Sequence, residues 1–290
     1  MNDQEPILIG VIGGSGLYEM ESLTDLQSID LETPFGSPSA PIRTGTLACK
    51  RVAFLPRHGL HHQISPPELP HHANLWAMKS LGVKWIISVS AVGSLKESIH
   101  PREMVVPDQF FDRTKNSAAH TFFKGGIVGH IAFGDPVCSI LATALYQAAN
   151  ASGAKTHWKG TYVNMEGPAF STRAESHFHR QMGFDIIGMT NLAEAKLARE
   201  AEISYATLAM VTDYDCWHQS AADVDVESVI AILRENVDLA KRTIAQTISG
   251  FDVTQDSPCH HSLDSAIMTP KGEWPAEKVS QLKPLLSRFL

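Results

Sequence analysis

Two acidic residues, Asp213 and Asp215, follow an apolar run at residues 205–211. The run predicts a buried strand, and because side chains alternate with a period of two, both acids would leave its carboxyl end on the same side. Such acids can accept hydrogen bonds from ring nitrogens or an exocyclic amine, and one whose pKa is raised by burial can give a proton to a leaving group. The alternative is a solvated Asp turn that only ends the strand.

Three other predicted strands end in groups that bind anions. The first is followed by Gly13-Gly14-Ser15-Gly16, in which glycines let backbone N–H groups approach an anion, although the same residues suit an ordinary tight turn. The second is followed by Arg57, a planar fork of donors, and by His58. The third is followed by hydroxyls that include Ser90. No Walker sequence or G-x-G-x-x-G accompanies them, so these strand ends predict a simple anion such as phosphate.

The segment at residues 164–175 joins a Gly-Pro turn to an aromatic and a carboxylate. Phe170, at the tip of the turn, either stacks on a planar ring or packs in the core. Glu166 either holds sugar hydroxyls or orders Arg57. After another predicted strand, Met189 offers an apolar thioether to a sugar face and Thr190 offers a hydroxyl.

A cluster of histidines raises the question of a metal. No acidic ligand set interleaves these residues and H-E-x-x-H is absent, so we predict no metal site and interpret most of them as surface or loop histidines. They are His58, His61, His62, His71 and His72.

Composition restricts the class of protein. A net charge of -7 argues against a general nucleic-acid or membrane-surface partner. No segment approaches membrane-spanning length, and the acidic N-terminus does not resemble a signal peptide. Four scattered cysteines without CxxC spacing suit reduced thiols. We therefore expect a cytoplasmic protein.

Apolar, β-branched runs alternate with helical patterns along the chain, which predicts an α/β fold with a mixed, largely parallel twisted sheet flanked by helices. We expect one domain over residues 1–290, with a core at about 7–250 and a loop and helix at about 251–290. The predicted strands are 7–12, 52–55, 85–89, 104–106, 186–189 and 205–211, and the predicted helices are 74–81, 139–151, 176–182, 194–202, 224–249 and about 275–289.

Taken together and in this order, the motifs resemble those of the trimeric purine nucleoside phosphorylases. The similarity spans roughly residues 7 to 250. It is carried by Ile12-Gly13-Gly14-Ser15-Gly16-Leu17, Thr33-Pro34-Phe35-Gly36, Arg57-His58-Gly59, Ala73-Asn74-Leu75-Trp76-Ala77, Asp108-Gln109-Phe110, Asp112-Arg113-Thr114, Glu166-Gly167-Pro168, Phe170-Ser171-Thr172-Arg173-Ala174-Glu175-Ser176, Gly188-Met189-Thr190 and Thr212-Asp213-Tyr214-Asp215-Cys216-Trp217.

The resemblance implies a role for each matching position. Met189 would lie against the ribose, Phe170 would line the base pocket, and Asp213 and Asp215 would face the purine. His130 matches a position that the neighbouring subunit of a homotrimer contributes. The implied phosphate ligands are Ser15, Arg57, His58, Ser90, Ala91 and Thr190, and the implied wall of a 5'-methylthio pocket is His62, Val226, Val229 and Ile230.

The implied activity is phosphorolysis of S-methyl-5'-thioadenosine to adenine and 5-methylthioribose 1-phosphate, a salvage reaction. Inorganic phosphate is the co-substrate, and no metal or redox cofactor is implied. Two carboxylates favour a 6-aminopurine, since one accepts from the amine while the other, protonated, donates to N7. We thus expect Asp213 to be the general acid at N7 and Asp215 to bind the amine.

Two other functions remain open. One is a phosphorylase for 6-oxopurine nucleosides or methylthioinosine, and the other is a catalytically silent nucleoside-binding protein. Three departures from the family pattern, Ala169, Asn191 and Ala193, together with the sequence Leu69-Pro70-His71-His72, leave the substrate range open.

Overall fold

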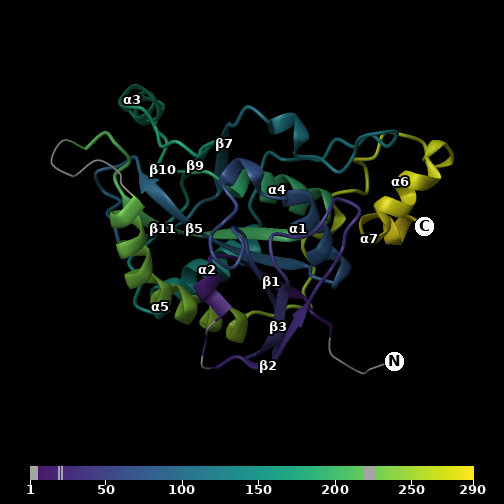
Figure 1. Cartoon of the computed structure of the whole chain (residues 1–290), viewed down its shortest axis with the longest axis horizontal. Coiled ribbons are helices and arrows are strands. Elements are labelled where there is room, and N and C mark those ends of the chain that lie inside the picture. The colour runs from purple at the N-terminus through teal and green to yellow at the C-terminus, as the bar shows by residue number, and fades with distance from the viewer. Residues whose placement is uncertain (1–5, 19, 21, 219–225) are drawn as a thin grey trace.

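The computed structural model of this chain describes residues 6–18, 20, 22–218 and 226–290, and for residues 15, 18, 226–229, 231 and 233–235 it describes the backbone alone. Within this part of the chain, eleven strands form one mixed sheet (Figure 1). They are β1 (Ile9–Gly13), β2 (Thr24–Ile29), β3 (Ile42–Leu47), β4 (Lys50–Pro56), β5 (Trp85–Ser94), β6 (Met104–Val106), β7 (Gln109–Arg113), β8 (Thr156–Trp158), β9 (Thr161–Met165), β10 (Ile186–Gly188) and β11 (Ser204–Asp213).

Strand β5 is the centre of the sheet. It pairs in parallel with β1 on one side and with β11 on the other, and β1 pairs in parallel with β4. Since these four strands run in one direction, their carboxyl ends lie at the same edge, which is where open α/β sheets bind ligands. The ends of neighbouring strands are aligned: Gly13 lies opposite Pro56, and Asp213 lies opposite Gly93.

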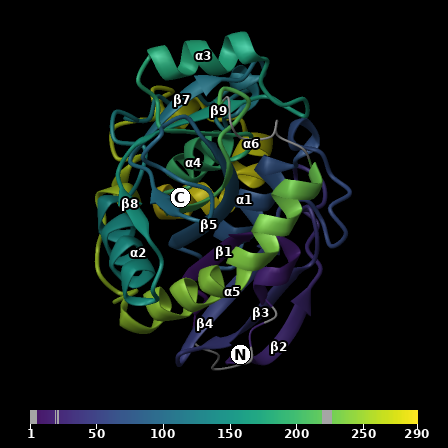
Figure 2. The same ribbon diagram turned by 90° about the vertical axis from the view of Figure 1, so that its left-hand side faces the viewer.

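Helices cover both faces of the sheet (Figures 1 and 2). Residues of α2 and α5 share a buried cluster with Ile9 and Val11 of β1. Residues of α1 and α4 share another with Ile12. Consecutive strand positions thus point to opposite faces, as a pleated strand requires. The helices are α1 (His71–Ser80), α2 (Ser139–Ala151), α3 (Arg173–Gln181), α4 (Asn191–Glu200), α5 (Val226–Gly250), α6 (Ala276–Gln281) and α7 (Lys283–Leu286).

The predicted fold class is confirmed. Of the ten strand pairings six are parallel, and each strand predicted from an apolar run is present. The sequence prediction missed β2, β3, β7, β8 and β9. Strand β2 is largely exposed and β7 is half-buried, so neither has the continuous apolar run that marks a buried strand.

The single C-terminal helix predicted at about 275–289 is wrong. The segment contains α6 and α7, separated at Leu282, and ends in a 3₁₀ turn at Ser287–Phe289. Pro284 explains the break, because it has no N–H to continue the hydrogen bonding of α6 and is tolerated only in the first turn of a new helix.

This C-terminal segment packs against α1. Leu282, Leu285 and Leu286 are buried in the same cluster as Ile12 and Leu55 of the sheet. One domain over residues 1–290 remains our prediction, and this shared cluster supports it.

Replacing Leu286 with Ala should therefore destabilise the whole protein. The side chain is 0% exposed, so its removal leaves a cavity and should lower the free energy of unfolding by about 2–5 kcal/mol. The matched control is Leu290→Ala, whose side chain is 58% exposed and should change stability by less than about 1 kcal/mol. Urea unfolding followed by far-UV circular dichroism measures both. Equal effects of the two variants would contradict this role of the segment.

Candidate active site

Arg57, directly after β4, lies at the common edge of the parallel strands and is 2% exposed. Its Nε and Nη2 donate to the Glu194 carboxylate, with Nη2 3.0 Å from Oε2. Nη1 donates to the Val89 carbonyl at 3.0 Å and Nη2 to Ser88 Oγ at 2.6 Å. These contacts use four of the five guanidinium N–H groups. Arg57 is thus held rigidly, with one N–H left for a ligand.

Glu194 is the partner that the sequence analysis missed. It lies on α4, is 1% exposed, and also accepts from Tyr205 Oη at 2.8 Å. Burial, the largest single influence, would favour the neutral carboxyl, but the charge and hydrogen bonds of Arg57, together with the Tyr205 hydroxyl and His71, lower the pKa of Glu194. The two residues therefore form a buried, ionised pair between the strands and α4.

The suggestion that Glu166 orders Arg57 is wrong. Glu166 accepts from the backbone N–H of Lys115, and the carboxylate that pairs with Arg57 is Glu194. The charge that balances Arg57 comes instead from a helix 137 residues farther along the chain. A Glu within the apolar run Leu192-Ala193-Glu194-Ala195 was the available signal, because a buried carboxylate needs a cationic partner.

Two predicted phosphate ligands lie beside Arg57. Ser90 is two residues beyond Ser88 on β5 and so points to the same face of the sheet, where its buried Oγ has no hydrogen-bond partner among the described residues. Thr190 is buried and precedes α4, one turn before Glu194. The N-terminus of a ten-residue helix adds partial positive charge there.

The other predicted phosphate ligands lie at the same strand ends. Gly14 follows β1, and the backbone N–H of Arg57 donates to the Gly13 carbonyl at 2.9 Å. The backbone of Ser15 therefore adjoins Arg57. The side chain of Ser15 lies outside the described residues. Ala91 is half-buried on β5 and can supply only backbone groups.

His58 is held in a neutral form. Its Nδ1 lies 2.8 Å from the Ile64 carbonyl, which fixes the tautomer with the proton on Nδ1. Burial, followed by the neighbouring Arg57 charge, lowers the pKa of His58 to about 4. Its Nε2 is therefore an acceptor at neutral pH.

Asp213 ends β11 and is poised to hold a proton. Thr212 Oγ1 donates to its Oδ2 and the Asp215 N–H donates to its Oδ1, each at 2.7 Å. Burial nevertheless raises the pKa of Asp213 to about 6, and the charge of Asp215 adds to this. Gly93 makes room for the carboxylate, because a Cβ there would lie 2.8 Å from Oδ1.

Asp215 does not continue the strand. The register slips between Val211 and Asp213, and Asp215 has a φ of 51°, so the turn and not the period of two brings the acids together. Asp215 is 5% exposed, its Oδ2 has no partner within the described part of the chain, and burial raises its pKa. A solvated Asp turn is thereby excluded.

The predicted contacts to sugar and base come from two loops. Phe170 is 42% exposed on the Gly-Pro turn, so it is not a core residue. Met189 lies under the same turn, since a Cβ on Gly167 would meet its Sδ at 2.5 Å. The turn therefore brings Phe170 and Met189 to the same part of the molecule.

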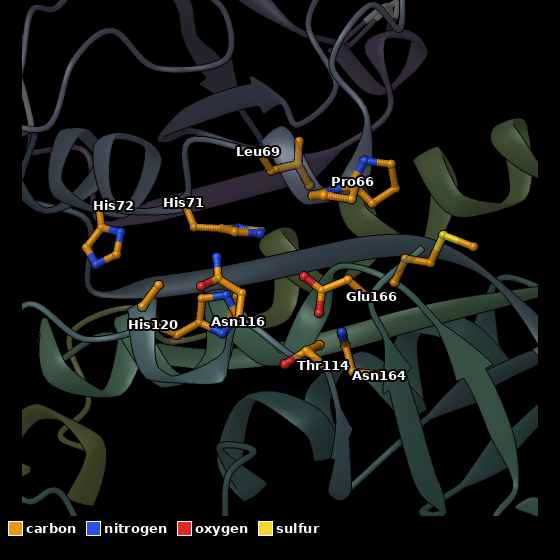
Figure 3. A pocket seen from close by; sticks show the side chains of 13 residues that line it. Pro66, Leu69, His71, His72, Thr114, Asn116, His120, Asn164 and Glu166 are labelled. Carbon is orange, nitrogen blue, oxygen red and sulfur yellow. The ribbon is translucent and has the colours of Figure 1, made fainter. Parts of the chain in front are cut away.

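Met189 also lines a cavity. Figure 3 shows this cavity beside His71 and His72 of α1. His71 extends into it, with Pro66 and Leu69 on one side and Asn116 and Asn164 on the other (Figure 3). The cavity is lined by Pro66, Pro67, Leu69, His71, His72, Thr114, Asn116, Ala119, His120, Asn164, Glu166, Met189 and Ala193.

The interpretation of the histidines as surface or loop residues is wrong for His71 and His72. His71 begins α1 and is buried, and His72 donates from Nε2 to the Thr121 carbonyl while stacking on Phe35. Burial lowers the pKa of His71 to about 4, so it is neutral. Among the residues that the structure describes, no group of three or more His, Cys, Asp or Glu is arranged to hold a metal.

The predicted 5' pocket is described only in part. The exposed His62 stacks on His58 with ring centroids 4.4 Å apart, and Ile230 on α5 is 41% exposed. The side chains of Val226 and Val229 lie outside the described residues. His130 is exposed, and its N–H donates to Ala266 at 2.8 Å, next to the exposed Val128 and Met268.

Two family departures have structural consequences. Asn191 is fully buried and its amide donates to Ser88 Oγ and Thr207 Oγ1, so it braces the strand that carries Ser90. Ala193 lines the cavity. Ala169 is exposed, and nothing in the structure explains it.

The edge of the mixed sheet thus brings anion donors and two carboxylates together, as the motifs predict. Residues 8–249 match the model of the Phosphorylase superfamily, and the chain belongs to this superfamily. The relationship indicated by the motifs is thereby confirmed.

Named relatives are similar over their full length. An S-methyl-5'-thioadenosine phosphorylase of Geobacter sulfurreducens is 53% identical and covers 98% of this chain and 99% of its own. A methylthioadenosine phosphorylase from an Antarctic soil metagenomic library superposes with a TM-score of 0.93 at 47% identity, over 98% of this chain and 100% of that one. A Schistosoma mansoni methylthioadenosine phosphorylase in complex with adenine superposes with a TM-score of 0.80 at 35% identity, over 86% of this chain and 94% of that one.

Replacing Glu194 with Gln should weaken the scaffold of the site. The amide keeps the shape but leaves the Arg57 charge unbalanced in the interior, which should cost about 3–5 kcal/mol of unfolding free energy. Glu166→Gln is the control, because that carboxylate contacts a backbone N–H and not Arg57. If both variants lose equal stability in urea unfolding, Glu194 has no special role.

Proposed function

We propose that this protein cleaves S-methyl-5'-thioadenosine with inorganic phosphate, releasing adenine and 5-methylthioribose 1-phosphate in purine and methionine salvage. The observation that carries the proposal is the pair Asp213 and Asp215 at the same sheet edge as Arg57 and Ser90. The names of the full-length relatives support it independently.

Phosphate would bind between β1, β4, β5 and the start of α4. Arg57 supplies its free N–H and its charge, while Ser90, Thr190, Ser15 and the backbone at Ala91 supply uncharged donors. Because His58 is neutral with Nε2 as acceptor, it would accept a hydrogen bond from the hydroxyl of a monohydrogen or dihydrogen phosphate. Fixed donors of this kind align the nucleophile with the anomeric carbon at little entropic cost.

Adenine would bind between Phe170 and the two carboxylates. Asp215 accepts from the 6-amino group, and Asp213 donates to N7. The two acids suit these roles because their surroundings differ. Asp213 is held by Thr212 and a backbone N–H, and its pKa is raised to about 6, so it can hold the proton. Asp215 leaves the strand in a left-handed turn and would face the exocyclic group.

The reaction follows from this placement. A phosphate oxygen forms a bond to the anomeric carbon as the bond to N9 breaks, and that electron pair passes to the purine. A proton from Asp213 at N7 neutralises the charge. Met189 packs against the ribose meanwhile. The reaction involves no oxidation or reduction, so we propose that no redox cofactor takes part. Arg57 offsets the charge of phosphate, so we propose that no metal is needed either.

The 5'-methylthio group would lie against His62, Val226, Val229 and Ile230. Apolar side chains suit a thioether and leave a 5'-hydroxyl unpaired, which costs about 1–3 kcal/mol.

We further propose a homotrimer in which His130 of one subunit completes the pocket of the next. The exposed, apolar Val128 and Met268 beside His130 support such an interface. Light scattering should then give three times the 31.7 kDa chain mass.

A cytoplasmic location and small-molecule partners alone are part of the proposal. Cys49, Cys138, Cys216 and Cys259 are free thiols, which suits a reducing compartment. Among the described residues no helix is both long and apolar enough to cross a bilayer.

The purified protein should release adenine from S-methyl-5'-thioadenosine only when phosphate is present, and chelator should not change the rate. Chromatography of the products checks this, with methylthioinosine, adenosine and inosine as parallel substrates. Release without phosphate would refute phosphorolysis. Faster turnover of methylthioinosine would favour the 6-oxopurine function, and binding without turnover would favour a silent binding protein.

The pH dependence should report Asp213. Because the protonated acid is the active form, kcat/KM for the nucleoside at saturating phosphate should fall as pH rises above about 6, the pKa of Asp213. Asp213→Asn can donate a hydrogen bond but no proton, so it should lower kcat by about 10²–10⁴-fold and remove this limb of the profile. Phosphate ionises in the same way in assays of both proteins, so any pH dependence that remains in the variant is due to phosphate and not to Asp213. An unchanged profile would rule out Asp213 as the acid.

A further inference from the structure

Behind Asp215, α3 contributes a buried polar cluster that the proposed function does not use. Ser176 is 0% exposed and His179 is 3% exposed. Asp215 Oδ2, Ser176 Oγ and both ring nitrogens of His179 have no hydrogen-bond partner among the described residues. Buried polar atoms without partners are costly, so these four, one of which belongs to the Asp215 carboxylate itself, call for a functional explanation.

Helix α3 is fixed to the turn that carries Asp215. Thr172 caps the helix by accepting from the Glu175 N–H. Arg173 donates to the Cys216 carbonyl at 2.9 Å, and the Cys216 thiol contacts the Ser171 carbonyl at 3.2 Å. Although α3 lies at the outer edge of the molecule (Figure 2), its inner face therefore keeps its position relative to Asp215.

Ser176 and His179 are three residues apart and occupy that inner face. The Ser176 hydroxyl lies beside Asp215 and, with Ser171, offsets the effect of burial on the pKa of Asp215. A protonated His179 acts on Asp215 in the same direction. Both residues thus favour the ionised carboxylate.

We propose that His179 is a positioning residue for nucleobase specificity. Through one buried water, its N–H donates to the Ser176 hydroxyl, which donates to the inner oxygen of Asp215. The outer oxygen then stays ionised and accepts from a 6-amino group. This inference rests on the proposed function, because it assigns the reading of that amine to Asp215.

A consequence is that specificity depends on the protonation of Asp215. A protonated Asp215 would donate to a 6-oxo group and lose its contact to the amine. The charged groups that face His179 are Arg113, Glu175 and Asp215, and burial together with Arg113 keeps the pKa of His179 below its usual value. The neutral imidazole is therefore the donor over the working pH range.

The test compares kcat/KM for S-methyl-5'-thioadenosine and for methylthioinosine, at saturating phosphate and across pH. His179→Phe keeps a ring but removes both nitrogens, and should lower the ratio of the two constants about tenfold near neutral pH. The ratio should recover as pH rises, because Asp215 then ionises without help. His179→Gln retains a donor and should restore part of the ratio. His177→Phe, on the exposed face of α3, is the matched control and should leave the ratio unchanged.

A structural role alone would lower both constants equally, so an unchanged ratio in His179→Phe would overturn the inference. If that variant does not fold, Ser176→Ala should lower the ratio in the same way, and its failure to do so would count equally against us. Asp215→Asn separates failure of the inference from failure of the proposed function. If the wild-type protein releases adenine but Asp215→Asn leaves the ratio of the two constants unchanged, only the inference is overturned. If the wild-type protein releases no adenine, the proposed function is overturned and the inference with it.

Discussion

The buried ion pair between Arg57 and Glu194 is the interaction on which the rest of the site depends. A guanidinium in the interior is stable only if a carboxylate balances it and its N–H groups find acceptors. Glu194 supplies the charge, and with Ser88 and the Val89 carbonyl it accepts from four of the five N–H groups. The pair also ties α4 to β4 and β5. The start of α4, with Thr190, is thereby held beside the strand ends that carry the other donors. The charge that would attract phosphate thus also fixes the geometry in which phosphate would be held.

The parallel direction of β1, β4, β5 and β11 is the second constraint. It brings four strand ends that are far apart in sequence to one edge, and each contributes a different group. The donors come from the ends of β1, β4 and β5, and the carboxylates come from the end of β11. Because β5 separates β11 from β1, the carboxylates and the glycine turn lie on opposite sides of Ser90. A nucleoside that spans this distance would meet acid at its base and donors at its sugar.

The strand ends were predictable because they combine local signals: an apolar run, then a polar or glycine residue. The sheet class and the convergence of Arg57, Ser90 and Asp213 followed from them. Glu194 was not predictable as the partner of Arg57, since a contact between residues 137 positions apart leaves no local pattern. The left-handed turn at Asp215 was missed for a related reason, because alternation assumes that the strand continues. The exposed strand β2 and the break at Pro284 depend on packing and on a single missing N–H, which periodicity does not register.

The two carboxylates differ through their neighbours and not through their sequence positions. Asp213 has its oxygens satisfied by Thr212 and by the Asp215 N–H, so its orientation is set within the turn itself. Asp215 has no such local donor for Oδ2 and depends on residues of α3, which the sheet does not position. Chemistry at the purine ring would therefore rest on the parallel strand ends of the sheet, whereas discrimination between exocyclic groups would rest on a peripheral helix. A family built this way can change the base that it accepts through α3 while the acid at the strand end stays in place.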